Sequence, residues 1–421
     1  MKRLFSVSRH APSEDRLHAL DAVRALVLLL GIVYHAALAY VPGVTGWVVT
    51  DGSQSLLLGA FVYVSHMFRM PTFFFMAGFL GRMVHHRRGG AYFVRDRLKR
   101  LLVPLVVGWL ALQPLVVWIW IWGAQRSGGR SLPVEVRQRP AWWLAAKAFQ
   151  TGAVFEAGVP LGHLWFLYYL LLLYGLTLLF RWGFVTRVDA GGGIRLQIDR
   201  QLDLLLPSFG APVVLAGPVA AALYWSRGWA GLPTPDTSLV PQLSSMTAYG
   251  MFLGLGWLLH RRVAGLSALR DRWRSRFWPA VVLSLLLMPT SGVAEESGEA
   301  GRSWLRLGYA VAYSTAMWCW VLAIVGVFLV YCSRPSAARR YASDSSYWLY
   351  LVHLPMISTL QVVFLGFPWH WSLKLALVLA LPLPALLLSY HYLVRFTFVG
   401  AVLNGRRRAP PWVSGRPSGP A

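Results

Sequence analysis

The sequence predicts an all-α, polytopic integral membrane protein with about ten transmembrane helices. Of its 421 residues, 56% are hydrophobic and 13% are charged, whereas a soluble globular protein averages about 25% charged residues. The apolar residues gather into stretches near the ~20 residues that a helix needs to cross the hydrocarbon core. This composition excludes a disordered protein and a nucleic-acid-binding domain with a soluble core.

Ten apolar stretches are predicted to span the membrane. In chain order they cover residues 22–41, 55–80, 101–122, 161–180, 204–225, 241–260, 277–291, 307–331, 346–366 and 371–394. The second contains His66, Arg69 and Pro71, so we expect that it could be broken. The seventh is short. The remaining stretches are long enough to cross the bilayer as single helices.

The first stretch could also be a signal peptide, since basic residues precede it and Ala37-Leu38-Ala39 resembles a cleavage site. However, Arg24 and His35 lie within it, and its length exceeds an h-region of about 7–15 residues. We therefore expect an uncleaved first helix.

The basic residues are distributed unevenly between the loops. With both termini cytoplasmic, the inner segments 1–20, 81–100, 181–203, 261–276, 332–345 and 395–421 contain 29 of the 40 Lys and Arg residues. The outer loops contain 8, and 3 lie within spans. This asymmetry follows the positive-inside rule. Topology therefore accounts for most of the net charge of +24, which need not indicate a nucleic-acid partner. The excess of basic residues on the inner side would also attract anionic lipid or an anionic cytosolic cofactor.

This topology divides the chain into three parts. We expect a basic cytoplasmic N-terminus over 1–20, a transmembrane domain over 21–395, and a disordered basic tail over 396–421.

Arg24 and His35 are the ionisable residues of the first span. They are eleven residues apart, which places them about 20° apart around a helix and about 16 Å apart along it. Ionisable groups at such depth are costly and indicate function by default. For Arg24, snorkelling to the inner interface is an equal alternative. We favour a functional role for His35 over a hydrogen bond to a neighbouring helix.

Two arginines, Arg97 and Arg100, follow the second span in a basic run. Their spacing of three puts them on one face of a helix. Planar guanidinium groups grip phosphate through paired hydrogen bonds, so the pair is a candidate anion site. A basic run that only sets topology is the structural alternative.

Other candidate residues lie near the outer membrane face or inside spans. His163 and Trp165 begin the fourth span, where a role in the aromatic belt is equally consistent. His353 lies about 10 Å inside the ninth span, where Pro355 loosens the helix. His66 and Arg69 could line a cavity. No spacing of His, Cys, Asp and Glu predicts a metal site, and no nucleotide-binding motif is present.

Four stretches together resemble the acyltransferase 3 family of integral membrane acyltransferases. They are Asp21 to Arg24 with His35 beyond, the run Phe73 to Phe79, Arg97-x-x-Arg100 before Pro104, and Tyr347 to Pro355 with His353. The similarity extends over about residues 15–395. Ala77-Gly78-Phe79 replaces the commoner Ser-Gly-Phe. The run Phe68-Arg69-Met70-Pro71 resembles the branch that contains glucans biosynthesis protein C, which is credited with succinylating periplasmic glucans.

The resemblance implies a multi-pass enzyme of a bacterial-type inner membrane. Such an enzyme moves an acetyl or succinyl group from cytoplasmic acyl-CoA, a co-substrate, to a hydroxyl of an extracytoplasmic carbohydrate. It implies as partners the lipid bilayer, acyl-CoA, a glycan acceptor and possible glycan-synthesis machinery, with no bound cofactor. Arg97, Arg100 and Arg24 would meet the CoA phosphates on the inner side.

For the chemical step, we expect His35 to act as general base on the sugar hydroxyl or to relay the acyl group. The developing oxyanion also needs a hydrogen-bond donor. Arg24, Tyr34 and His353 are the candidates for that role.

Two readings without covalent chemistry compete with this one. Intramembrane Arg and His residues also serve the substrate and proton pathways of transporters and flippases. The chain shows no clear internal symmetry of the kind that favours a transporter. A membrane sensor of a small molecule is the second alternative, and it needs no acyl donor. Consumption of acyl-CoA that depends on active protein would exclude both.

Overall fold

The computed structural model describes residues 14–44, 46–128, 132–226, 231–263, 265–290 and 299–405. Every regular element in these ranges is helical, which confirms the all-α class. Within them, six helical stretches are long and apolar enough to cross a membrane: His18–Tyr40, Leu56–Gly128, Gly162–Val188, Trp304–Tyr331, Ala337–Phe364 and Trp371–Val394. The count of about ten spans and the cytoplasmic location of both termini stay predictions.

Sixteen α-helices form the described structure. They are α1 (Glu14–Ala37), α2 (Leu56–Arg97), α3 (Val103–Gly128), α4 (Val134–Gln138), α5 (Ala141–Thr151), α6 (Trp165–Gly183), α7 (Gly193–Leu205), α8 (Ala211–Tyr224), α9 (Leu243–Leu259), α10 (Gly265–Asp271), α11 (Trp273–Leu287), α12 (Glu299–Tyr331), α13 (Ala337–Phe364), α14 (Trp371–Ala380), α15 (Pro382–Ser389) and α16 (Phe398–Leu403). Helix α16 lies within the segment predicted as a tail, whereas 1–13 and 406–421 lie outside the described residues.

The second predicted span, residues 55–80, is unbroken, and the interruption of the helix lies beyond its end. Helix α2 runs through Pro71 without interruption and is broken at Gly89, which has φ 80° and ψ 170°. Glycine adopts this positive φ at no steric cost. A π-helical segment, Leu98–Leu102, then leads into α3. The second and third predicted spans therefore belong to one nearly continuous helical stretch.

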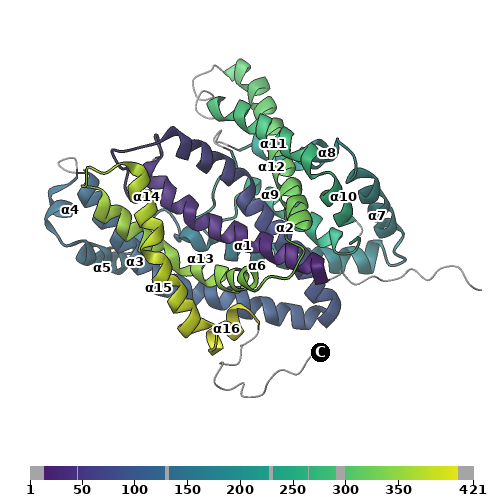
Figure 1. Cartoon of the computed structure of the whole chain (residues 1–421), viewed down its shortest axis with the longest axis horizontal. Helices are drawn as coiled ribbons and strands as arrows, with labels where there is room; N and C mark the ends of the chain where they lie inside the picture. Colours follow the sequence, from purple (N-terminus) through teal and green to yellow (C-terminus); the bar gives the residue numbers. More distant parts are fainter. Residues whose placement is uncertain are drawn as a thin grey trace, which may run out of the picture.

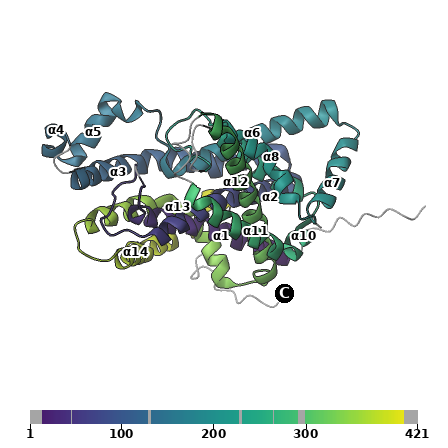
Figure 2. The same cartoon turned by 90° about the horizontal axis from the view of Figure 1, so that it is seen from above.

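Helices α1 and α13 form the centre of the bundle that carries the site. Helix α1 packs against α13 and α2, and α13 also contacts α3 and α14. Figure 2 shows α1 and α13 between α3 on one side and α14 on the other. In Figure 1, α4 and α5 lie at one end of the bundle, and α7 and α10 lie at the opposite end, where α1 begins. Helices α1 and α13 therefore extend between the two opposite ends of the molecule (Figure 1).

The aromatic run near Gly78 is a packing element. A Cβ at Gly78 would lie 2.0 Å from the carbonyl oxygen of Leu253, and a Cβ at Gly256 would lie 2.0 Å from that of Phe75. The two glycines thus let α2 and α9 approach closely, as small residues do between membrane helices. Phe74, Phe75 and Phe79 are fully buried around this contact. This run positions α2 and leaves the chemistry to other residues.

Candidate active site

Two histidines from distant parts of the chain are in direct contact. His35 lies near the end of α1, and His353 lies in the middle of α13. Nδ1 of His35 lies 2.8 Å from Nε2 of His353. The rings are nearly parallel, with centroids 5.1 Å apart and planes 8° apart. Both side chains are buried. The two histidines predicted within spans therefore form one pair.

Hydrogen bonding determines which nitrogen of each ring carries a proton. Nδ1 of His353 lies 2.7 Å from the Tyr350 carbonyl oxygen, so it must be the protonated donor. In the neutral ring, Nε2 of His353 is then an acceptor, and Nδ1–H of His35 donates to it. The lone pair of His35 is consequently on Nε2. No hydrogen bond occupies that nitrogen within the described residues, so it is available as a base.

Trp47 and Gln361 fix the position of the His35 ring. The Trp47 ring stacks on His35 with centroids 5.7 Å apart and planes 18° apart. Trp47 Nε1–H donates to Oε1 of Gln361 at 3.1 Å. Nε2 of Gln361 in turn donates to the carbonyl oxygens of His35 at 3.1 Å and Ala36 at 3.0 Å. These carbonyls lie at the end of α1, where helix carbonyls lack intrahelical partners.

A buried ion pair anchors the segment that carries Trp47. Lys374 Nζ lies 2.6 Å from an oxygen of Asp51, and each side chain is 2% exposed. The backbone N–H of Asp51 also donates to the carbonyl oxygen of Ala39 at 2.9 Å. Burying a charge in this environment is costly unless it is paired. Lys374 was recognisable as a cation within a span, whereas its partner Asp51 had no sequence signal.

A cavity of about 580 Å³ opens beside His35. Its walls combine aromatic rings with hydrogen-bonding groups, contributed by His35, Trp47, Gln113, Trp120, His163, Trp165, Thr234 and Asp236. The mixture of apolar walls and a few polar groups is typical of a small-molecule site. His35, His163 and Trp165, three residues predicted from sequence, therefore share this cavity.

His163 and Asp236 place polar groups on the cavity wall. Nε2–H of His163 donates to the Leu351 carbonyl oxygen at 2.8 Å, and its ring lies 5.5 Å from that of His353. The backbone carbonyl of Asp236 accepts hydrogen bonds from the N–H groups of Leu161 and Gly162. Burial raises the pKa of the Asp236 carboxyl. Sequence reasoning missed Asp236, because a single loop aspartate carries no motif.

Tyr34, His66 and Arg69 form a group next to the histidine pair. His66 Nε2–H donates to the carbonyl oxygen of Leu232 at 2.7 Å, so its Nδ1 accepts from the Tyr34 hydroxyl at 3.4 Å. The Arg69 guanidinium lies 4.4 Å from the centre of the Tyr34 ring. Tyr34 thus links this group to His35, whose ring meets it edge to face at 5.6 Å.

Arg69 is a buried cation with unused donors. Its side chain is 5% exposed. Nε and Nη1 make no hydrogen bond to the described residues, and no carboxylate among them forms an ion pair with Arg69. Buried polar groups are nearly always hydrogen-bonded, so unused guanidinium donors require an explanation such as a ligand.

Arg24, Arg97 and Arg100 form a group farther back along α1, toward its beginning. Arg97 and Arg100 both contact the Asp96 carboxylate, at 2.8 Å and 3.7 Å. Arg24 donates to the Ser343 hydroxyl at 2.8 Å, and its charge acts on Arg100. About 16 Å of helix separates Arg24 from His35. The structure therefore groups Arg24 with the two other arginines and separates it from the histidine pair.

The combination of a buried histidine pair, an adjacent cavity and a distant arginine cluster agrees with the family match. The model of the acyltransferase 3 family, an acyltransferase domain, matches residues 17–389. The chain belongs to this family and is an acyl-transferring enzyme of the membrane.

Curated relatives carry the name glucans biosynthesis protein C. The protein from Escherichia coli O6:K15:H31 is 29% identical over 155 residues, which cover 36% of each chain. The protein from Salmonella typhi is 27% identical over 168 residues, or 40% of each chain. A third, from Escherichia coli strain SMS-3-5, is 34% identical over 92 residues, covering 22% of this chain and 23% of the relative. The aligned regions thus span less than half of each relative. No solved structure matches significantly.

Proposed function

We propose that the protein transfers an acyl group from cytoplasmic acyl-CoA to a hydroxyl of a carbohydrate on the other side of the inner membrane. The observation that carries this proposal is the unoccupied Nε2 of His35 beside a cavity with aromatic and polar walls. The name of the curated relatives supports a glucan as the acceptor. A periplasmic glucan would enter the cavity from the end of the bundle opposite the arginine cluster.

The proposed chemical step uses His35 as general base. Nε2 takes the proton of the acceptor hydroxyl as its oxygen bonds to the thioester carbonyl carbon. The carbon–sulfur bond of the resulting tetrahedral intermediate then breaks. The CoA thiolate leaves and takes up, from Nε2, the proton that came from the acceptor hydroxyl. His353 accepts a hydrogen bond from Nδ1–H throughout, which keeps the lone pair on Nε2 directed away from His353.

A reconstituted system tests this function. Proteoliposomes with acyl-CoA on the arginine-cluster side and a linear β-glucan on the other side should yield an ester of the glucan, detected as a mass increase by mass spectrometry. An unchanged glucan in vesicles that consume acyl-CoA would point to another acceptor. An unchanged glucan without acyl-CoA consumption would contradict the proposal.

Arg97 and Arg100 are proposed to bind the CoA phosphates, with Arg24 beside them. Hydrogen bonds between charged groups contribute about 1.5–3 kcal/mol each. The double variant Arg97→Gln/Arg100→Gln should therefore raise the KM for acyl-CoA at least about 10-fold. Lys99→Gln is the matched control, because Lys99 is exposed between the two arginines. Equal KM values for both variants, measured by CoA release, would place the donor elsewhere.

The position of Arg69 favours a dicarboxylic acyl group as the group that is transferred. A Cβ at Gly31 would lie 2.7 Å from Nη1 of Arg69. Because Gly31 precedes His35 by four residues, Arg69 lies about one helical turn from His35 toward the arginine cluster. Arg69 therefore lies on the side of His35 from which a donor bound at that cluster would approach, and its unused donors suit a terminal carboxylate. This arrangement favours succinyl over acetyl transfer.

The change Arg69→Gln tests the choice of acyl group. It should lower kcat/KM for succinyl-CoA by at least about 10-fold more than for acetyl-CoA, since one charge-assisted hydrogen bond to the carboxylate is lost. Acetyl-CoA serves as the internal control. An equal loss with both donors would instead assign Arg69 to the developing oxyanion that both reactions share.

His353 is proposed as a positioning residue for His35. Replacing it with Leu removes the acceptor for Nδ1–H, and the His35 ring can then rotate or exchange tautomers. We expect kcat to fall about 10- to 100-fold, by analogy with the loss of partners that orient metal-binding histidines. His353→Gln keeps a side-chain acceptor and should retain more activity. Equal kcat values and equal pH profiles for both variants would exclude this role.

A further inference from the structure

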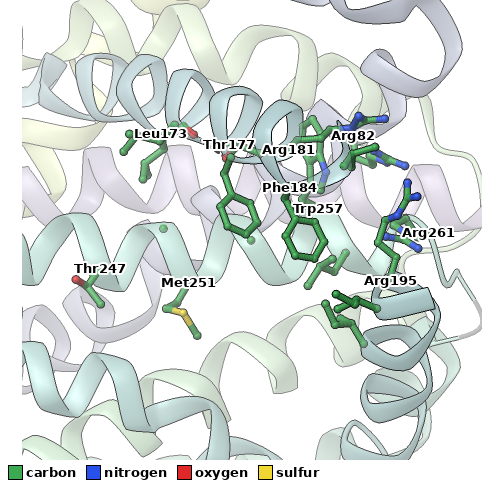
Figure 3. A pocket seen from close by; sticks show the side chains of 18 of the residues that line it. Arg82, Leu173, Thr177, Arg181, Phe184, Arg195, Thr247, Met251, Trp257 and Arg261 are labelled. Carbon is green, nitrogen blue, oxygen red and sulfur yellow. Dashed lines mark hydrogen bonds between the residues drawn. The ribbon is translucent and has the colours of Figure 1, made fainter. Parts of the chain in front are cut away.

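A second cavity, of about 740 Å³, lies between α6 and α9, and α7 contributes to its lining. Its lining is strongly divided between charged and apolar residues. Figure 3 shows the guanidinium groups of Arg82, Arg181, Arg195 and Arg261 gathered at one end, and Leu173 and Met251 toward the other. All four arginines lie in segments that the sequence assigns to the cytoplasmic side.

The charged end has more cations than anions. Asp199 pairs with Arg261 at 2.8 Å, and Asp189 pairs with Arg195 at 2.6 Å. Arg82 and Arg181 form no ion pair with a carboxylate in the part of the chain that the structure describes. Nε of Arg82 is buried there without a hydrogen-bond partner.

These arginines also repel one another. The charges of Arg181, Arg261 and Arg195 all act on Arg82. Like charges held together at a partly buried site are destabilising, and a bound anion removes that cost. The charged end is therefore complementary to a phosphate group.

The apolar end is shaped for a hydrocarbon chain. Phe180 and Phe184 stack at 5.4 Å beside the arginines. From Arg181 back to Leu173 the wall extends over about 12 Å of helix, enough for much of a lipid chain. On the facing helix, Gly254 has open space where a side chain would begin. Glycine at this position leaves the groove empty between α6 and α9.

This cavity is separate from the one that contains His35. Trp165 and Tyr249 are both buried, with ring centroids 5.2 Å apart, and neither lines the second cavity. Trp165 lines the cavity of His35, whereas Leu173, two turns farther along α6, lines the second cavity. His35 does not line the second cavity, and this separation argues against an acyl donor as its occupant.

We propose that this cavity binds an anionic phospholipid, with the headgroup phosphate on Arg82 and Arg181 and an acyl chain between α6 and α9. The cytoplasmic leaflet supplies anionic lipids to basic pockets between membrane helices. The site is independent of the acyl-transfer reaction, so a lipid held there supports the α6–α9 contact whichever substrate the enzyme uses.

Native mass spectrometry of the purified full chain tests this site with phosphatidylglycerol and phosphatidylcholine as probes. Wild type should bind phosphatidylglycerol at least 10-fold more tightly than phosphatidylcholine. Arg82→Gln/Arg181→Gln should abolish that preference. Arg262→Gln is the matched control, because Arg262 pairs with Asp203 and does not line the cavity. It should bind like wild type.

A second variant tests the apolar end without changing charge. Gly254→Leu should fill the groove and weaken phosphatidylglycerol binding at least 10-fold, while its melting temperature shows that it is folded. Equal affinity for the two lipids in wild type would overturn the proposal. So would unchanged preference in the double arginine variant, or stoichiometric displacement of phosphatidylglycerol by acetyl-CoA. None of these readouts requires acyl transfer, so the result is independent of the proposed function.

Discussion

Replacing His35 with Gln is expected to lower kcat by about 10²- to 10⁴-fold, the usual contribution of a general base. Glutamine fills a similar volume and can still donate to His353, but its amide does not take a proton from a hydroxyl at neutral pH. The KM for acyl-CoA should change little, because the proposed phosphate contacts lie about 16 Å away along α1. CoA release by purified protein in detergent, with acceptor supplied, measures both constants.

His86→Gln is the control for the His35 change. His86 is an exposed histidine of α2 and does not line the cavity beside His35. It should leave kcat and KM at wild-type values. A His35→Gln enzyme that is folded and keeps more than half of the wild-type kcat would remove the general base from the account, and with it the role assigned to His353.

Replacing Lys374 with Met should destabilise the protein by about 3–5 kcal/mol, because the Asp51 carboxylate then stays buried without its partner. The double variant Lys374→Met/Asp51→Asn removes both charges and should recover most of that loss. Unfolding of the detergent-solubilised protein, followed by its tryptophan fluorescence, measures the difference.

Lys147→Met is the comparison for Lys374. Lys147 pairs with Glu135 at 3.0 Å, but both side chains are largely exposed, so its loss should cost less than about 1 kcal/mol. Equal stabilities for the Lys374 and Lys147 variants would mean that Lys374 and Asp51 contribute little to the anchor of the Trp47 segment. In that case the ring that covers His35 would be held mainly by Gln361.

The sequence alone predicted much of the fold class and singled out both members of the histidine pair. Hydropathy was sufficient for an all-helical membrane fold, because a chain in lipid must satisfy its backbone hydrogen bonds internally. His35 and His353 were both identified as histidines inside spans, where an ionisable group needs a reason. Their contact could not be derived, because 318 positions separate them and only the packing of α1 on α13 brings them together.

Other features were missed for different physical reasons. Asp51, Asp236 and Gln361 are isolated polar residues, and their roles arise from tertiary contacts that no spacing encodes. For Arg24, the rise of a helix already implied a separation of about 16 Å from His35. Its proximity to Arg100 arises from tertiary packing, which spacing along the chain does not encode.

The number of spans was also hard to predict, because span boundaries depend on how the chain bends. The predicted second and third spans are joined in a stretch that bends at Gly89, and α8 and α9 are apolar but short. A helix that packs inside the bundle need not match the full thickness of the bilayer. Hydropathy therefore located the apolar helices, while the count of about ten membrane crossings stays a prediction.

The measurement that tests the central claim most directly is CoA release by inside-out membrane vesicles, with wild type compared with His35→Gln. Vesicles receive acetyl-CoA or succinyl-CoA outside and periplasmic glycans inside. We predict release in wild type, faster with succinyl-CoA, and a loss of at least about 10²-fold in the variant. Transport of the glycan without any CoA release, in vesicles that contain folded protein, would contradict acyl transfer and favour a transporter.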